Sequence, residues 1–243
     1  MCGRYVLKRK DLEVLLAQLG VRDPRDFVSR YNIAPTTVIP VIRIKKDTTA
    51  RETVGLQWGL VPFWSKDAKG SARLANARAE GIATKPSFRE AFRKRRCVVP
   101  ASGFYEWQTI GRQKQPWFFQ LRDEGPFALA ALWEHWRSAD GAVLETCALI
   151  TTTPNEVVRP LHDRMPVILR GAALDTWLDT SVNEPARLEP LLTPLPAELM
   201  KSTPVSPRMN EVRYEHPDCI DPMPLPATVP PAPPATQLGL GLE

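Results

Sequence analysis

The sequence is poor in the residues and runs that mark secreted, membrane-bound and metal-binding proteins. Its 243 residues include only four cysteines, and these form no C-x-x-C pair. Such spacing argues against a zinc site and a disulfide framework, and it suits a reduced cytosol. No apolar run reaches the roughly 18 residues that a membrane-spanning helix requires. No charged segment followed by an apolar stretch opens the chain, so we expect a cytoplasmic protein rather than a secreted one.

What the sequence does contain is the composition of a globular protein with a basic balance. Apolar residues make up 43% of the chain and charged residues 24%, which is enough for a full core. The formal net charge is +5, and the stretch from Pro222 onward carries only Glu243. The positive charge therefore belongs to the body of the chain. It permits a polyanionic partner such as a nucleic acid, although many basic proteins bind none.

Short candidate strands separated by turns dominate the body of the chain. We expect strands over residues 3–7, 37–44, 54–58, 97–107, 117–121, 127–133, 146–151, 167–169 and 200–205. We expect helices over residues 12–19, capped by Asp11 and ended by Gly20, over 86–93 and over 174–178. We also expect residues 151–155 to form the cap and first turn of a short helix. This pattern favours an α+β fold, with a mostly antiparallel, barrel-like β-sheet and a few flanking helices.

The composition changes at Pro222. Proline, alanine and threonine dominate from there to Thr236, which predicts an extended, disordered tail. We therefore expect a folded domain over residues 1–221 and a tail over residues 222–243. The tail ends in Gln237–Leu242, where leucine occupies every second position behind a glutamine. This end is either a docking peptide or a disordered end without a role.

The chain opens with Met1-Cys2-Gly3-Arg4. A small second residue lets the initiator methionine be removed, so we expect a mature chain that begins at Cys2, held at the mouth of the first strand. Its α-amine and thiol have unperturbed pKa values of about 8 and about 8.5, which leaves each a reactive minor form at neutral pH. An aminothiol of this kind condenses with an aldehyde to an imine and then closes a thiazolidine ring. The alternative is an incidental residue in a frayed terminus.

Two titratable residues are candidates for acid–base chemistry. Glu106 is the single carboxylate in the apolar segment over residues 97–107. Burial among aromatic residues would raise its pKa towards neutrality, as a general acid or base requires, unless it points outward on a polar face. His162 is flanked by Asp163 and Arg164, which indicates a site, although a lone histidine is more often structural.

Two further segments are candidate nucleic-acid contacts, each with an alternative. Phe63 and Trp64 follow a proline in a loop, where they either fill the core or form a surface on which bases stack. The basic run over residues 93–96 is either a solvated helix end, favoured by the helix dipole, or an edge that contacts phosphates.

Taken together, six segments resemble the SRAP family, the SOS response-associated peptidase proteins that crosslink to abasic sites in single-stranded DNA. The matching segments are Met1–Tyr5, Arg30–Thr36, Trp58–Trp64, Asn76–Glu80, Arg96–Trp107 and Leu161–Pro166. The resemblance covers about residues 1–220. It implies a single barrel-like α+β domain, removal of Met1 with an associated autoproteolytic peptidase activity, and capture of the abasic sugar by Cys2 as a thiazolidine. Abasic-site lyase activity belongs to the same expectation.

The resemblance also implies the site residues and partners. The catalytic residues would be Cys2, Asn76, Glu106 and His162. The residues that hold the DNA strand would be Arg4, Pro35, Trp64, Arg78, Thr151 and Arg164, with Phe63 beside them. We expect no metal, no cofactor and no membrane partner, and a monomer that joins the nucleoid when bound to DNA. The segment Gln237–Leu242 is similar to the Q-L-x-L-x-L peptide that docks on bacterial sliding clamps.

Three other functions remain open on the sequence. Glutamine amidotransferases also begin Met-Cys-Gly, and in these N-terminal-nucleophile amidohydrolases the Cys thiolate attacks an amide. A self-processing peptidase would use Cys2 and Glu106 on the Met1–Cys2 bond alone. A non-catalytic single-strand binder would use its tail to recruit a clamp.

Overall fold

The structure, a computed structural model, describes residues 2–22 and 27–224. Its strands are β1 (Tyr5–Leu7), β2 (Arg30–Ile33), β3 (Val38–Ile44), β4 (Arg51–Trp58), β5 (Asn76–Arg78), β6 (Arg96–Ala101), β7 (Gly103–Ile110), β8 (Gln113–Leu121), β9 (Phe127–Arg137), β10 (Val143–Thr152), β11 (Met165–Pro166), β12 (Ile168–Leu169) and β13 (Met200–Pro204). Its α-helices are α1 (Arg9–Leu19), α2 (Arg89–Lys94), α3 (Gly171–Leu178) and α4 (Pro185–Leu188). Most of the expected strands are present, whereas β2, β5 and β11 were not expected.

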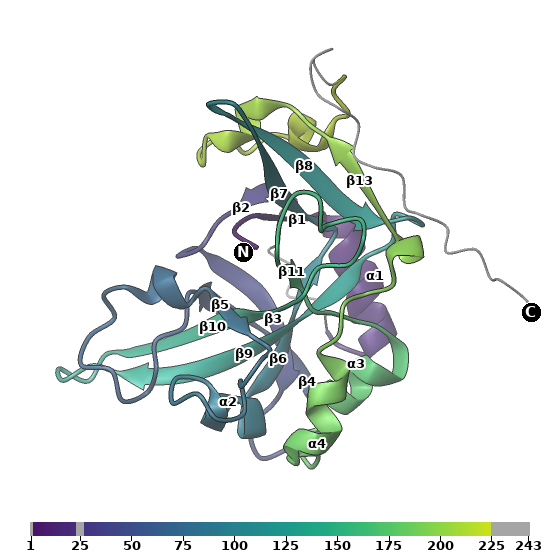
Figure 1. The fold of residues 1–243 in the computed structure, drawn as a ribbon. Helices are drawn as coiled ribbons and strands as arrows, with labels where there is room; N and C mark the ends of the chain where they lie inside the picture. The colour runs from purple at the N-terminus through teal and green to yellow at the C-terminus, as the bar shows by residue number, and fades with distance from the viewer. Residues whose placement is uncertain (1, 23–26, 225–243) are drawn as a thin grey trace, which may run out of the picture.

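Five strands close into a barrel in the order β10-β4-β3-β6-β9, because β10 pairs with both β4 and β9 (Figure 1). Neighbouring strands run antiparallel except β10 and β4, which run parallel. Their apolar side chains, such as Val41, Leu56, Val98 and Leu129, are buried. The α+β class and the barrel-like sheet are thus confirmed.

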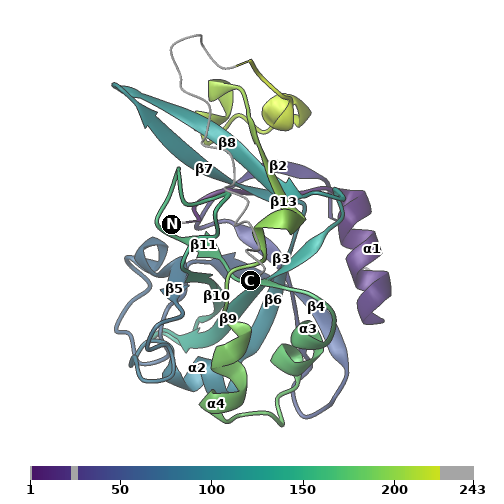
Figure 2. The same cartoon turned by 45° about the vertical axis from the view of Figure 1, so that its right-hand side comes forward.

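A second, five-stranded antiparallel sheet has the order β13-β8-β7-β1-β2. In Figures 1 and 2 it stands above the barrel, and β1 lies where the two sheets meet. The carbonyl of Val6 in β1 accepts a hydrogen bond from the N–H of Ser102, the residue between β6 and β7. The N-terminal strand is therefore held at the junction of the sheets.

The single strand expected over residues 97–107 was wrong, because the chain changes sheets at Ser102. β6 belongs to the barrel and β7 to the second sheet. Glycine is required at position 103, since a Cβ there would stand 2.3 Å from the ring of Phe118 and 2.6 Å from the carbonyl oxygen of Phe119. An unbroken apolar run fits either sheet equally well, so it does not reveal the bend.

Helix α1 forms as its leucine spacing predicts. The apolar residues of its buried face are Leu12, Leu15, Leu16 and Leu19. Gly20 ends the helix with φ of +64°, a left-handed conformation that glycine adopts without steric cost. The expected cap was wrong, because Lys8 holds that position without a side-chain bond and Asp11 lies in the first turn. Asp11 pairs with Lys8 at 3.1 Å instead.

Two other expectations were also wrong. No helix begins at residues 151–155, because Thr151 and Thr152 belong to β10 and a turn follows, in which Asn155 Oδ1 accepts from the N–H groups of Val157 and Val158. The basic run over residues 93–96 is not uniformly solvated, because Arg96 is buried. Its guanidinium donates to five main-chain carbonyls, and burial lowers its pKa to about 10. Arg96 is therefore neither part of a solvated helix end nor available to contact phosphates.

The described chain ends just inside the expected tail. Pro222 forms an isolated bridge with Val205. The rest of the tail, including Gln237–Leu242, lies outside the described residues, as does Met1. Every helix in the described ranges is too short or too polar to pass through a lipid bilayer.

Candidate active site

Cys2 lies three residues before the start of β1, at the junction of the two sheets. Its side chain is fully buried, so the expected place beside the first strand is right but the residue is enclosed rather than open. Burial raises the pKa of the Cys2 thiol, and the negative charge of Glu106 adds to the shift. The thiol therefore stays protonated at neutral pH.

Asn76 reaches Cys2 from the opposite sheet. It opens β5, which runs parallel to β10 with Asn76 opposite Leu149. Its side-chain Nδ2 donates to the carbonyl oxygen of Cys2 at 2.9 Å. Its Oδ1 is buried, and no atom within the described ranges donates a hydrogen bond to it. An amide whose acceptor oxygen is buried and unpaired is suited to receive a hydrogen bond from a ligand.

Glu106 reaches the same site from β7. Only 2% of the residue is exposed, so the outward-facing alternative is excluded. Burial, followed by the negative charge of Asp163, raises its pKa from 4.5 to about 7. At neutral pH the carboxyl therefore populates both protonation states, as a residue that accepts and returns protons must.

His162 lies in the segment that leads into β11. Its Nε2 is 4.0 Å from Glu106 Oε2, and its Nδ1 accepts from the N–H of Arg164 at 2.9 Å. With its lone pair on Nδ1 engaged, the neutral imidazole carries its proton on Nε2, the nitrogen nearer Glu106. Burial lowers the pKa of His162.

A cleft of about 540 Å³ brings Glu106 and His162 to the surface, whereas Cys2 and Asn76 do not line it. It is lined by Arg4, Glu106, Trp107, Lys114, His162 and Asn210. Sequence reasoning missed the last part of this wall, where the indole N–H of Trp107 donates to Asn210 Oδ1 at 2.7 Å. Asn210 in turn donates to the carbonyl of Lys114 at 2.9 Å. The aromatic residue beside Glu106 was a usable signal, whereas Asn210 is distant in sequence and lies where the resemblance to the family is less clear.

The three arginines expected to contact phosphates differ in their surroundings. Arg78 on β5 is exposed. Arg4 is partly buried and donates to Asn32 Oδ1 at 2.7 Å and to the carbonyl of Met209 at 3.3 Å. Arg164 is buried. Of these three, Arg78 is the most exposed, and Arg4 is the one that lines the cleft.

Arg164 is held by acceptors of the protein itself. Its two terminal nitrogens donate to the two carboxylate oxygens of Glu80 at 2.7 and 2.8 Å. One of them also donates to the carbonyl of Thr151 at 2.5 Å. Arg164 thereby ties the segment that carries His162 to β10 and to the end of β5.

The remaining expected DNA contacts lie outside the lining of the cleft. Phe63 and Trp64 are 53% and 55% exposed, which excludes the core-filling alternative. Pro35 is half-buried in the turn between β2 and β3. Thr151 is buried in β10, and its Oγ1 has no hydrogen-bond partner among the described residues.

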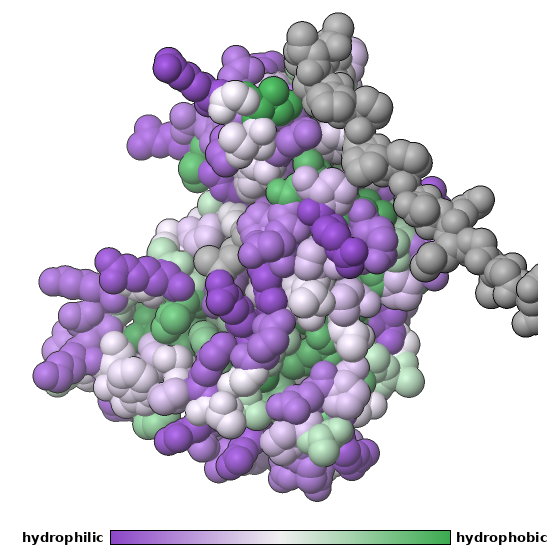
Figure 3. Space-filling view, viewed as in Figure 1, coloured by the Kyte–Doolittle hydropathy of each residue, from purple (hydrophilic) through white to green (hydrophobic). Residues whose placement is uncertain are grey.

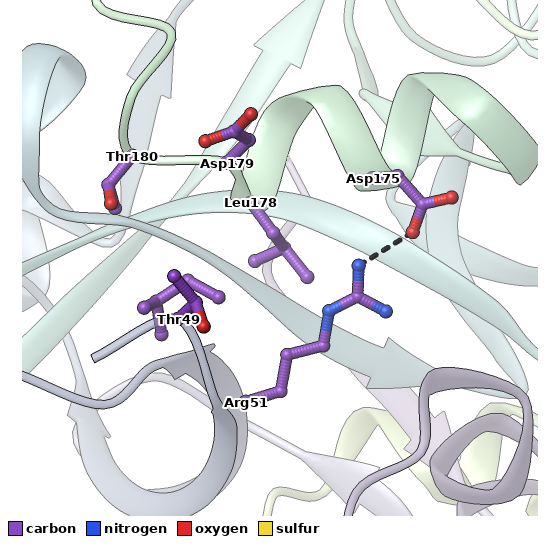
Figure 4. Close-up of a pocket in the computed structure, with 7 residues that line it drawn as sticks. Thr49, Arg51, Asp175, Leu178, Asp179 and Thr180 are labelled. Atoms are coloured by element: carbon purple, nitrogen blue, oxygen red, sulfur yellow. Dashed lines mark hydrogen bonds and ion pairs between the residues drawn. The ribbon is translucent and has the colours of Figure 1, made fainter.

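Other hollows and clusters do not compete with this cleft. A smaller one of about 270 Å³ lies between β4 and α3, where Arg51 pairs with Asp175 at 2.7 Å (Figure 4). None of the expected catalytic residues lines it. Within residues 2–22 and 27–224, no three histidine, cysteine, aspartate or glutamate side chains form a cluster that could hold a metal ion. Hydrophilic side chains cover most of the face shown in Figure 3.

Comparison with known proteins identifies the family. The chain is 36% identical over 225 residues to abasic site processing protein YoqW of Bacillus subtilis, covering 91% of this chain and 99% of that protein. It is 33% identical to abasic site processing protein HMCES of chicken, covering 80% of this chain and 66% of that protein.

A crystal structure of a Bacteroides thetaiotaomicron protein matches the fold with a TM-score of 0.81 and 27% identity. The match covers 91% of this chain and all of that one. A model of the SOS response associated peptidase family matches residues 1–212. The chain therefore belongs to the SOS response associated peptidase (SRAP) family.

Proposed function

We propose that this protein captures abasic sites in single-stranded DNA as a covalent crosslink through Cys2. Its relatives in Bacillus subtilis and chicken are named abasic site processing proteins. The observation that carries the proposal is a chain of contacts among residues from four separate segments. Asn76 holds the carbonyl of Cys2, Glu106 acts by its charge on the Cys2 thiol, and Glu106 and His162 lie 4.0 Å apart on one cleft. Removal of Met1 would give Cys2 the free α-amine that the reaction needs.

The first step opens the abasic sugar. This sugar exists mostly as a closed hemiacetal, which hides its aldehyde. His162, protonated on both nitrogens, delivers the Nε2 proton to the ring oxygen as the bond between that oxygen and C1′ breaks. The C1′ hydroxyl proton passes to water, and the aldehyde is released. The position of His162 on the cleft suits this role.

The second step joins the protein to the sugar. Glu106 takes a proton from the Cys2 ammonium, and the neutral amine attacks the aldehyde with loss of one water. The protonated Cys2 thiol then adds its sulfur to the resulting imine, and its proton passes to the nitrogen, which closes the thiazolidine. The raised pKa of the Cys2 thiol fits this order, in which the amine reacts first.

Asn76 and the geometry of the cleft support both steps. Asn76 does not titrate, so its Oδ1 can orient the amine without a change of charge. Holding the sugar against Cys2 converts the attack into an intramolecular reaction, for which effective molarities of about 10⁵ M or more are known. If the ring fails to close, the imine permits β-elimination, which is the lyase reaction.

The DNA strand would follow the basic surface around the cleft. Exposed Arg78 is suited to a phosphate, and exposed Phe63 and Trp64 are suited to stacking with bases. Single strands fit because their bases are already unstacked. Autoproteolysis of the Met1–Cys2 bond and docking of Gln237–Leu242 on a sliding clamp are further parts of the proposal.

A denaturing gel tests the proposal. Wild-type protein mixed with an abasic single-stranded oligonucleotide should give a slowly migrating adduct, and an intact oligonucleotide should give none. Cys2→Ala should abolish the stable adduct, whereas Cys219→Ala, which removes another buried thiol, should retain it. A stable adduct with Cys2→Ala would contradict the proposal. Glutamine hydrolysis in the absence of DNA would instead support the amidohydrolase alternative.

A further inference from the structure

One nitrogen of His162 faces two groups with opposite requirements. Nδ1 lies 2.9 Å from the backbone nitrogen of Arg164, whose N–H needs a lone pair to donate to. The same Nδ1 lies 3.0 Å from Asp163 Oδ1, a carboxylate oxygen that needs a proton to accept. A single imidazole nitrogen carries either a proton or a free lone pair, so it satisfies one neighbour at a time.

The two neighbours therefore favour two different forms of the ring. With the Arg164 N–H engaged, His162 is neutral and holds its proton on Nε2. With Asp163 engaged, Nδ1 keeps a proton, and Nε2 is the position that gains or loses the second one. Nε2 is the nitrogen that lies 4.0 Å from Glu106 at the cleft. Only in the second form can Nε2 donate a proton and leave a neutral imidazole ring behind.

We propose that Asp163 is a positioning residue that holds the Nδ1 proton of His162 while Nε2 protonates the sugar ring oxygen. The inference rests on the proposed function for its place in the reaction. The imidazolium gives its Nε2 proton to the ring oxygen, which takes the electron pair of its broken bond to C1′. The proton of the C1′ hydroxyl leaves to water. The ring that remains is neutral, with its Nδ1 proton directed to Asp163.

Burial and the positive charge of the N-terminal amine both lower the pKa of His162, and the negative charge of Asp163 acts against them at Nδ1. The guanidinium of Arg164 is adjacent, but Glu80 pairs with it through both carboxylate oxygens. Glu106 faces the ring from β7 at Nε2, on the other edge of the imidazole. Asp163 itself is 84% exposed, so water weakens its effect. We expect a shift of about half a pKa unit on His162, the size typical of an exposed ion pair.

Titration of the histidines by NMR tests the contact without DNA. The chain has only three histidines, and His162→Gln identifies the signal of His162. Asp163→Asn should lower the midpoint of His162 by about half a unit, and Asp163→Glu should restore most of it. Glu156→Gln is a matched control, since it removes an exposed carboxylate from the preceding turn, where it pairs with Arg159.

Crosslinking kinetics test the role in the reaction. The rate with a closed abasic sugar should fall several-fold in Asp163→Asn at pH values above the midpoint, and less below it. An unchanged His162 midpoint, or a rate loss that does not depend on pH, would overturn the inference. Failure of the wild type to crosslink would contradict the proposed function instead, and the NMR titration would still decide whether Asp163 and His162 interact.

Discussion

At the scale of single residues, the site depends on a carboxyl group placed where it is costly to charge. Glu106 is enclosed by the second sheet, and its burial raises its pKa to about 7. A surface glutamate would be fully ionised at that pH and would be a weak base. The same burial that prepares Glu106 for proton transfer must lower the stability of the folded protein once the group ionises.

Glu106→Gln should therefore stabilise the protein at high pH. The folded state binds the Glu106 proton more tightly than the unfolded state does, so its stabilising effect is complete below pH 4.5 and is lost as the pH rises through about 7. The full pKa shift of Glu106 corresponds to a change of at most about 3 kcal/mol in the free energy of unfolding. Urea unfolding at pH 8.5 should show the variant to be more stable, by up to that amount.

Glu106→Gln should slow the reaction although it stabilises the folded protein. Its crosslinking rate should fall by about 10²-fold or more, because glutamine cannot accept a proton. Equal unfolding free energies of variant and wild type at pH 8.5 would show that Glu106 is ionised without cost, and would remove the physical basis of its assigned role.

His162→Gln should separate ring opening from attack by the amine. We expect its rate with a natural abasic site to fall by about 10²-fold, the usual contribution of a general acid. An oligonucleotide that carries an aldehyde unable to cyclise needs no ring opening, so it should react at nearly the wild-type rate. An equal loss with both substrates, measured by quenched time courses, would place His162 in a later step.

At the scale of elements, the bend between β6 and β7 sets the direction of the strand that carries Glu106. Gly103→Ala should destabilise the protein by about 3 kcal/mol or more, because its Cβ would meet the Phe118 ring and the Phe119 carbonyl. Gly111→Ala is the matched control, since it has a positive φ and open space around it, and it should cost about 1 kcal/mol. Similar losses in the two variants, measured by urea unfolding, would mean that the chain can bend elsewhere.

The pair of Glu80 and Arg164 links β5 to the segment that carries His162. Glu80→Gln should reduce stability by about 1 to 2 kcal/mol, a discounted value because Glu80 is half exposed. It should also slow crosslinking without changing the affinity for undamaged single-stranded DNA, since Arg164 acts here as a tether. Glu184→Gln, at another exposed pair, should change neither property.

An opposite result would assign Arg164 to phosphate binding, as the family resemblance implies. In that case Glu80→Gln would free the guanidinium, and the affinity for undamaged single strands would rise. A fluorescence-anisotropy titration at fixed salt distinguishes the two outcomes.

The sequence predicted the elements better than their assembly. Alternating apolar residues located most strands, and the leucine spacing with Gly20 located α1. The change of sheet at Ser102 escaped prediction because the segment is apolar on both sides of the bend. Strand β5 escaped it because three residues are too few to show a period.

At the scale of the whole molecule, the fold brings an N-terminal residue together with three distant segments. Cys2 enters at the junction of the two sheets, where Asn76 approaches from the barrel side and Glu106 from the second sheet. The sequence suggested Cys2, Glu106 and His162 by their chemistry, and the family resemblance added Asn76. Asn210 could not be found in this way, because its place on the cleft depends on long-range packing of the C-terminal segment against β7 and β8.

The central claim is that the α-amine and thiol of Cys2 act together on the abasic aldehyde. Intact-mass spectrometry of the purified protein, before and after mixing with an abasic oligonucleotide, tests it most directly. We predict a protein that lacks Met1, and an adduct whose mass is the sum of protein and oligonucleotide less one water. A protein that retains Met1 and still forms the same adduct in full yield would contradict the account.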